Sequence, residues 1–188
     1  LVVSPGIDKK SPWIVAATQA RAFITTETEE ALRWITAPII AITGTNGKTT
    51  TTVLVGEMFK ADSKTAFVGG NIGNPLLNHV MANDRAEVVI GEISSFQLDL
   101  AVKLVPAVAV VTNIDQDHLD RYTSMDAYIA SKRKLVQLCD KNSYCVLNYD
   151  DPIVQKFSEV TSAKILWFTK QDPMKVPAPF AENFRGCY

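Results

Sequence analysis

A lysine and a threonine follow two glycines in residues 42–52, which read ITGTNGKTTTT. Glycines at this spacing let backbone N–H groups turn toward a phosphate, and a helix that begins near Lys48 adds the positive end of its dipole. Lys48 would then neutralise the β- and γ-phosphates of a nucleotide, and the hydroxyl of Thr49 would bind Mg²⁺. Ile42 stands where the common loop G-x-x-x-x-G-K-S/T has its first glycine, and the glycine here is Gly44. We therefore predict a phosphate-binding loop that is shorter or differently turned than the common one, rather than a glycine turn before an ordinary helix.

A glutamate at the end of the next apolar strand is the second candidate. Glu92 follows the run 88–90 in AEVVIGEISSFQL, at the carboxyl end of a strand, where doubly wound sheets bind their ligands. A carboxylate there can hold Mg²⁺ opposite Thr49. The alternative is a glutamate that faces solvent. The nearby phosphate loop favours the metal role.

Polar residues crowd the segment 110–122, VVTNIDQDHLDRY, after another apolar run. His118 could bind a divalent ion through a neutral imidazole, whereas His79, the other histidine, is expected on a helix surface. TNID resembles the guanine-reading N-K-x-D sequence, but Ile114 replaces its lysine, and this argues against a guanine site. Four side chains of the segment should lie at the same edge of the sheet: Asp117, His118, Asp120 and Arg121.

A lysine lies on the apolar stripe of the helix expected at residues 125–139, MDAYIASKRKLVQLC. Lys132 falls on the stripe, while Arg133 and Lys134 point away from it. A long lysine side chain can reach out of such a surface to solvent. A lysine that is held inward beside a metal site can instead lose its proton and react. The residues alone leave both readings open.

Short apolar runs alternate with helical patterns along the chain, and this predicts an α/β fold with a mostly parallel sheet and helices on both faces. We expect strands at residues 1–3, 22–25, 39–43, 65–68, 88–90, 107–112, 144–147 and 165–168. We expect helices at residues 11–20, 28–35, 48–60, 75–81, 96–103, 125–139 and 152–160.

Two domains are expected to share the chain. Residues 1–26 give a strand, a helix and a strand, which is too little for a domain and suits the C-terminal remnant of one. Residues 27–188 should form a central P-loop ATPase-type domain that is incomplete at its C-terminal end. The chain begins without methionine, so we interpret it as an excerpt from a longer protein.

Composition excludes some classes of protein. The 188 residues are 47% hydrophobic, enough for a substantial core, and the net charge of −1 does not support a nucleic-acid or membrane-surface protein. Cys139, Cys145 and Cys187 form no C-x-x-C pair and suit reduced thiols in a cytosol. No apolar run approaches the roughly 18 residues of a membrane span, and no signal peptide is evident. We expect a cytoplasmic protein. The sequence does not fix the oligomeric state, and a monomer is our expectation.

Several motifs together resemble the Mur ligases, ATP-dependent amide-forming enzymes of bacterial peptidoglycan synthesis. They are GTNGKTT, the glutamate after the next buried strand, TNIDQDHLD and the Y-x-x-x-K that follows, and the resemblance runs from residue 2 to about residue 150. The short G-T-N-G-K-T loop is itself the form found in that family. GGNIGNP (69–75), EISSFQL (92–98) and DHLDRY (117–122) are similar to the member that adds D-glutamate. VVSPGI (2–7) is similar to the end of a Rossmann-like UDP-binding domain in that enzyme.

The resemblance implies a role for each matched residue. Lys48, His118 and Lys132 would be catalytic. Thr49 and Glu92 would bind one Mg²⁺, and His118 with Lys132, as a carbamate, would bind a second. Asn71, Ser94 and Ser4 would contact the substrate. The ATP phosphates would lie against Gly44, Thr45, Asn46, Gly47, Lys48, Thr49 and Thr50.

The resemblance also implies the reaction. ATP would phosphorylate the carboxylate of UDP-MurNAc-L-Ala, and the amine of D-glutamate would attack the acyl phosphate. The family's adenine-contacting and D-glutamate-contacting segments are not matched here, so residues 1–188 alone should be inactive. Another amino-acid-adding Mur ligase and folylpolyglutamate synthase are alternatives that GGNIGNP and SSFQL disfavour. A nucleotide-binding module without catalysis is an alternative of another class and gives Lys132 no role. An inert fragment of the fold is the remaining alternative.

Overall fold

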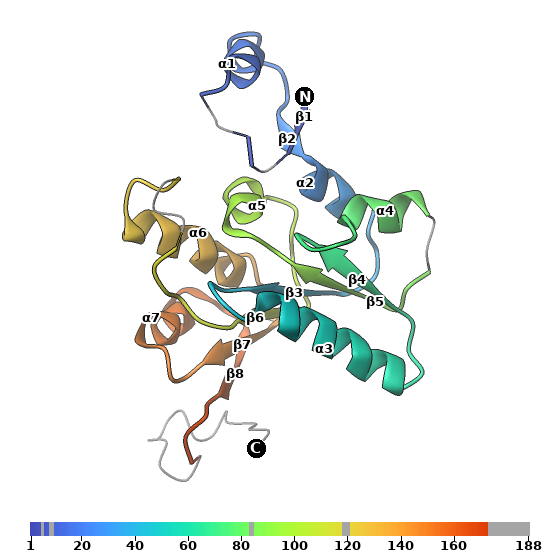
Figure 1. Cartoon of the computed structure of the whole chain (residues 1–188), viewed down its shortest axis with the longest axis vertical. Helices are drawn as coiled ribbons and strands as arrows, with labels where there is room; N and C mark the ends of the chain where they lie inside the picture. The colour runs from blue at the N-terminus through green and yellow to red at the C-terminus, as the bar shows by residue number, and fades with distance from the viewer. Residues whose placement is uncertain (5, 8–9, 83–84, 118–120, 173–188) are drawn as a thin grey trace.

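One parallel sheet of six strands forms the centre of the protein (Figure 1). The computed structural model describes residues 1–4, 6–7, 10–82, 85–117 and 121–172. The strand order is β4-β5-β3-β6-β7-β8, and each neighbouring pair is parallel. The strands are β3 (Ile39–Thr43), β4 (Ala66–Gly70), β5 (Val88–Glu92), β6 (Val108–Val111), β7 (Tyr144–Asn148) and β8 (Lys164–Phe168). Because β3 lies between β5 and β6, the carboxyl ends of these three strands meet at one edge.

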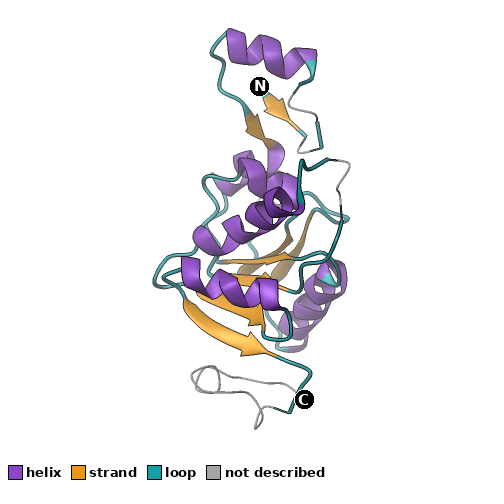
Figure 2. Cartoon of the chain, turned by 90° about the vertical axis from the view of Figure 1, so that its left-hand side faces the viewer, coloured by secondary structure: helices purple, strands orange, loops and turns teal. Residues whose placement is uncertain are grey.

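Helices cover both faces of this sheet (Figures 1 and 2). Alternate strand side chains point to opposite faces, so Ile42 packs toward α3 on one face while Ala41 packs toward the other helices. The helices on that second face cover the larger core cluster. The helices are α2 (Glu27–Leu32), α3 (Lys48–Ala61), α4 (Leu76–Met81), α5 (Ser95–Leu100), α6 (Met125–Gln137) and α7 (Pro152–Gln155), which a 3₁₀ turn (Lys156–Val160) extends.

The first residues form a small separate unit (Figure 2). Strands β1 (Val2–Val3) and β2 (Thr25–Thr26) pair in parallel, and α1 (Pro12–Gln19) between them has no buried residue. Trp13 is 79% exposed. This unit meets the sheet domain through α2, whose first turn is capped by the Thr26 side chain.

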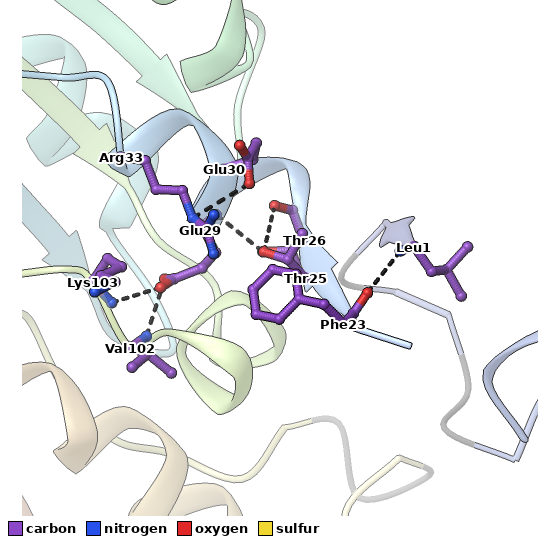
Figure 3. Close-up of polar contacts among 9 residues, drawn as sticks. All are labelled: Leu1, Phe23, Thr25, Thr26, Glu29, Glu30, Arg33, Val102 and Lys103. Carbon is purple, nitrogen blue, oxygen red and sulfur yellow. Dashed lines mark hydrogen bonds and ion pairs between the residues drawn. The ribbon is translucent and has the colours of Figure 1, made fainter. Parts of the chain in front are cut away.

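Glu29 ties α2 to the segment that follows α5, within the sheet domain (Figure 3). Its buried carboxylate accepts hydrogen bonds from the backbone N–H of Val102 at 3.0 Å and of Lys103 at 2.6 Å. These amides follow the end of α5, where Ala101 has already turned extended. The helix expected at residues 96–103 therefore ends at Leu100.

The predicted fold class is confirmed, and each predicted strand and helix is present, most of them with shifted ends. One prediction is wrong: His79 is buried, not on a helix surface, and its ring lies 5.0 Å from that of Phe67 on β4. The short helix α4 packs along β4 and α2, and His79 lies on the side of α4 that faces Phe67, which its polar neighbours in the sequence did not indicate. Among the described residues, no helix combines the length and the apolar character that a membrane crossing requires.

Candidate active site

The loop between β3 and α3 has the predicted turn. Gly44 and Gly47 have φ angles of +146° and +80°, and α3 begins at Lys48. A Cβ atom on Gly44 would lie 1.9 Å from the Oγ1 atom of Thr112, so a side chain cannot be placed there without moving Thr112. Gly47 has open space around it, and its positive φ is what favours glycine. Residues 46 and 47 are exposed, so the turn faces solvent and is open to a ligand.

Residues 112–115, which follow β6, hold this loop in shape, and we call them the brace. Thr112 Oγ1 and Asn113 Nδ2 donate hydrogen bonds to the carbonyl oxygen of Asn46 at 2.7 and 3.0 Å. Asn113 Oδ1 accepts from the backbone N–H of Asn46 at 2.9 Å. The sequence pattern assigned Asn113 no role of its own, whereas the structure shows it hydrogen-bonded to the phosphate loop.

Thr45 joins the loop to both the brace and α6. Its N–H donates to the carbonyl oxygen of Asn113 at 2.8 Å, and its hydroxyl accepts from the N–H of Asp115 at 2.9 Å. The same hydroxyl lies 3.0 Å from the hydroxyl of Tyr128. These contacts are buried or partly buried, so the loop conformation is fixed by its neighbours as well as by its glycines.

Glu92 and Thr49 lie together, as predicted. Glu92 is 2% exposed, and its Oε2 atom accepts a hydrogen bond from Thr49 Oγ1 at 2.7 Å. The other carboxylate oxygen accepts from Asn71 Nδ2 at 2.9 Å. Asn71 is placed by Gly70, whose φ of +103° lets the chain pass the Glu92 carbonyl, where a Cβ would lie only 2.3 Å away.

These oxygen atoms fit a hard divalent cation. A buried carboxylate beside a hydroxyl is the kind of ligand pair that Mg²⁺ prefers. Among the described residues, no group of three or more His, Cys, Asp and Glu side chains could hold a metal ion. An ion between Thr49 and Glu92 would therefore take its remaining ligands from water and from nucleotide phosphates.

Lys48, the first residue of α3, reaches back over the loop that precedes it. Its Nζ atom donates to the carbonyl oxygen of Thr45 at 2.7 Å, which places its charge within the turn. The side chain is partly exposed, so it remains available to a bound anion.

Lys132 is held inward. It is 2% exposed, its Nζ atom donates to the carbonyl oxygen of Gly44 at 2.8 Å, and the same atom lies 4.8 Å from the centre of the Tyr128 ring. Burial, together with the positive charge of Lys48, lowers the pKa of Lys132 from 10.5 to about 7, although the charges of Asp117 and Glu92 act in the opposite direction. The reading in which this side chain reaches solvent is therefore wrong, and a substantial neutral fraction of the amine is present at neutral pH.

The remaining predicted site residues form hydrogen bonds elsewhere, are exposed, or lie outside the described residues. Ser94 caps α5, since its hydroxyl accepts from the N–H of Gln97 while Gln97 Oε1 accepts from the N–H of Ser94. Ser4 is exposed in the N-terminal unit, and its carbonyl oxygen accepts from the N–H of Ile7 at 3.0 Å. Thr50 is exposed in the first turn of α3. His118 and Asp120 lie outside the described residues.

Arg121 follows that undescribed stretch and contacts the N-terminal unit. Its guanidinium donates to the carbonyl oxygen of Gly6 and lies 5.0 Å from the centre of the Phe96 ring. This places Arg121 between the two parts of the chain, a contact that the sequence did not predict.

Comparison with known proteins agrees with this geometry. A family model described as the Mur ligase middle domain matches residues 42–183. The chain is 47% identical over 171 residues to the UDP-N-acetylmuramoylalanine–D-glutamate ligase of Geobacter metallireducens, a match that covers 91% of this chain and 38% of the relative. It is 40% identical over 171 residues to the protein of that name from Clostridioides difficile, covering 90% of this chain and 38% of the relative.

Solved structures share the fold. The MurF ligase of Thermotoga maritima, in complex with ADP, matches 92% of this chain and 47% of its own with a TM-score of 0.64 at 19% identity. At this low identity the match supports the fold alone. The chain spans about two fifths of the length of the curated relatives described above, 38% in each case.

Proposed function

This chain belongs to the Mur ligase family, and we propose that it is part of an enzyme that adds D-glutamate to UDP-N-acetylmuramoyl-L-alanine at the expense of ATP. The relatives that carry this activity in their names support the choice of amino acid. The observation that carries the proposal is the cluster at the carboxyl ends of β3 and β5. There the phosphate loop brings Thr49 against the buried carboxylate of Glu92 and the carbonyl of Gly44 against the buried amine of Lys132.

Residues 44–50 bind the ATP phosphates in this proposal. The turned backbone and the N-terminus of α3 supply N–H groups, and Lys48 neutralises charge on the transferring phosphoryl group. Thr49 and Glu92 would hold one Mg²⁺, and His118 with Lys132 would hold a second. When bound, these ions offset the negative charge that ATP and the acceptor carboxylate bring together.

Lys132 carries a carbamate in this proposal. Its neutral amine attacks the carbon of CO₂: the N–C bond forms as one C=O π bond opens onto its oxygen, and the nitrogen releases a proton to give the carbamate anion. The carbamate would place an anionic oxygen ligand where the amine stood, and a neighbouring Mg²⁺ would favour it. The low pKa of the amine supports this step because only the neutral form has the required lone pair.

The reaction has two stages. The γ-phosphoryl group passes from ATP to the carboxylate of the L-alanyl group, because a free carboxylate is a poor acyl donor. The amine of D-glutamate then attacks the acyl phosphate, and phosphate leaves as the amide forms. Asn71, Ser94 and Ser4 contact the UDP-linked substrate on our proposal, although Asn71 and Ser94 also order the site through Glu92 and the cap of α5.

The chain contributes two parts to the longer enzyme. Residues 1–26 form the end of the UDP-substrate-binding domain, and residues 27–188 form most of the central ATP-binding domain. We propose that the enzyme acts as a monomer in the bacterial cytoplasm, on small molecules and not on nucleic acid.

Phosphate release by the full-length protein tests the function. We expect release that requires both UDP-MurNAc-L-Ala and D-glutamate, and that stops when D-glutamate is replaced by L-lysine or diaminopimelate. Release with another amino acid would assign the chain to a different member of the family. ATP binding without amide formation from any of these substrates would instead favour a non-catalytic nucleotide module.

A further inference from the structure

The turn between β7 and α7 supports the brace from behind. Asp151 is a buried residue whose two carboxylate oxygens serve different elements. Oδ1 caps α7 by accepting from the N–H groups of Ile153 at 2.9 Å and Val154 at 3.1 Å. Oδ2 accepts from the N–H of Ile114, in the middle of the brace, at 2.6 Å.

Asn148 provides a second link from the same turn. Its Nδ2 atom donates to the carbonyl oxygen of Thr112 at 2.8 Å. Thr112 and Ile114 are therefore both tied to the β7–α7 turn through their backbone. The residues that alternate with them, Asn113 and Asp115, bind the phosphate loop.

We propose that Asp151 is a positioning residue for nucleotide binding, acting through the brace on the phosphate loop. The hydrogen bond from Ile114 N–H to Asp151 holds the backbone of the brace in place. The neighbouring residues Asn113 and Asp115 are thereby held in the orientation in which they bond to the phosphate loop. Loop amides bind a phosphate well only when they are already oriented toward it. Loosening the brace therefore weakens nucleotide binding without removing any group that touches the nucleotide. The inference rests on the proposed nucleotide site but not on the identity of the amino acid that is added.

A single substitution separates the two roles of Asp151, which are to cap α7 and to accept the hydrogen bond from Ile114 N–H. Asparagine caps helices as well as aspartate does, so Asp151→Asn keeps an oxygen acceptor for Ile153 and Val154. Its amide group then presents N–H to the N–H of Ile114, and that hydrogen bond is lost. Because two donors lie on the helix side and one on the brace side, the side-chain oxygen stays with the helix.

The adjacent aspartate is a matched control. The carboxylate of Asp150 accepts from the N–H of Lys170 at 2.7 Å and from Gln171 Nε2 at 2.9 Å. Asp150→Asn makes the same change of charge one residue away, but it acts on the segment that follows β8 and not on the brace.

The experiment measures dissociation constants of the full-length protein for ATP and for UDP-MurNAc-L-Ala by calorimetry, with thermal unfolding alongside. Asp151→Asn should weaken ATP binding about tenfold, the scale of one lost hydrogen bond to a charged group. Binding of the UDP substrate should stay within about twofold, as should both constants for Asp150→Asn. If the dissociation constant for ATP is the same in Asp151→Asn and Asp150→Asn, the proposal is overturned, even if Asp151→Asn is less stable to heat.

A second variant covers the case in which Asp151→Asn does not fold. Asn148→Ala removes the other link to the brace and should also weaken ATP binding more than UDP-substrate binding. If Asp151→Asn does not fold and Asn148→Ala binds ATP normally, Asp151 contributes to stability and not to nucleotide binding. That result would overturn the inference. An unsubstituted protein that binds ATP but forms no amide would contradict the proposed function alone, because the ATP constants are measured without turnover.

Discussion

The Nζ atom of Lys132 lies 2.8 Å from the carbonyl oxygen of Gly44. A buried amine thus contacts Gly44, the loop glycine at which Thr112 occupies the space that a Cβ atom would need. The contact joins α6 to the phosphate loop, and the charge of Lys48 on the same loop helps to lower the pKa of Lys132. Lys132 is therefore the lysine whose amine is available in its neutral form at this loop.

Lys48→Ala in the full-length enzyme should abolish turnover while leaving the fold intact. In the proposed reaction this charge faces the transferring phosphoryl group, and its loss should lower the rate by at least roughly 10²–10³-fold. Lys60→Ala, at the exposed far end of the same helix, is the control and should keep normal phosphate release. Near-normal release by Lys48→Ala, measured in a coupled phosphate assay, would contradict the assignment of the loop.

Gly44→Ala should lose both stability and ATP binding. The new methyl group would overlap Thr112 Oγ1, and the residue would keep a φ of +146° that favours glycine. We expect a destabilisation of about 2–4 kcal/mol from overpacking and backbone strain together. Gly91→Ala, whose Cβ would meet its nearest atom at 3.4 Å, is the control. Equal unfolding midpoints for the two variants would show that the close approach to Thr112 relaxes without cost.

Glu29→Ala should destabilise the protein without changing its affinity for ATP. The substitution leaves the N–H groups of Val102 and Lys103 without their buried acceptor (Figure 3), at a cost of about 1–3 kcal/mol. Glu30→Ala is a matched control, because it removes only an ion pair with Arg33 at 3.4 Å on the helix surface and should cost less than about 1 kcal/mol. Urea unfolding measures both. Similar losses in the two variants would show that the buried Glu29 contacts stabilise the fold no more than the surface ion pair does.

Local patterns predicted the parts of the site that depend on neighbours in the sequence. The apolar strand, the glycines and the start of α3 placed the phosphate loop, and the helical stripe placed Lys132 on the inner face. Glu92 was predicted because a strand that ends beside a phosphate loop brings its last side chain to the same edge. Each of these inferences needed only the period of one element and the order of the strands.

Contacts between distant segments could not be predicted in this way. The hydroxyl of Thr45 and the carbonyl of Asp115 are 70 residues apart in the sequence, and their hydrogen bond depends on the register of β3 with β6. Asp151 reads as an ordinary helix cap before Pro152, and nothing local shows that its second oxygen reaches Ile114. The burial of His79 likewise depends on how a short helix packs against β4.

Unmodified Lys132 should make stability rise with pH. Its pKa falls from 10.5 in the unfolded chain to about 7 in the folded protein, so between these values the unfolded chain holds a proton that the folded chain has lost. The free energy of unfolding therefore increases as the pH rises through this window. Urea unfolding at pH 7 and pH 9.5, in buffers free of CO₂, should show a rise that Lys132→Met lacks. Identical pH dependence of the two proteins would mean that the amine is not desolvated.

The carbamate on Lys132 is the most specific chemical prediction. Lys132→Ala in the full-length enzyme should lose activity, and short carboxylic acids such as acetate or propionate should restore part of it by taking the place of the missing anion. A carbamate also carries one carbon from dissolved CO₂, so protein equilibrated with ¹³C-bicarbonate and Mg²⁺ should give a carbamate resonance in its ¹³C NMR spectrum. That resonance should be absent from Lys132→Ala.

Lys134→Ala is the control for this experiment. Lys134 lies two residues away on the same helix, where its Nζ atom donates to the carbonyl oxygen of Asp99 at 2.9 Å, outside the phosphate loop. It should keep the resonance, and its activity should not respond to added carboxylic acids. An unsubstituted enzyme that is active but shows no carbamate resonance would rule the modification out. Full activity of Lys132→Ala would go further, because it would remove any need for an anion at this position.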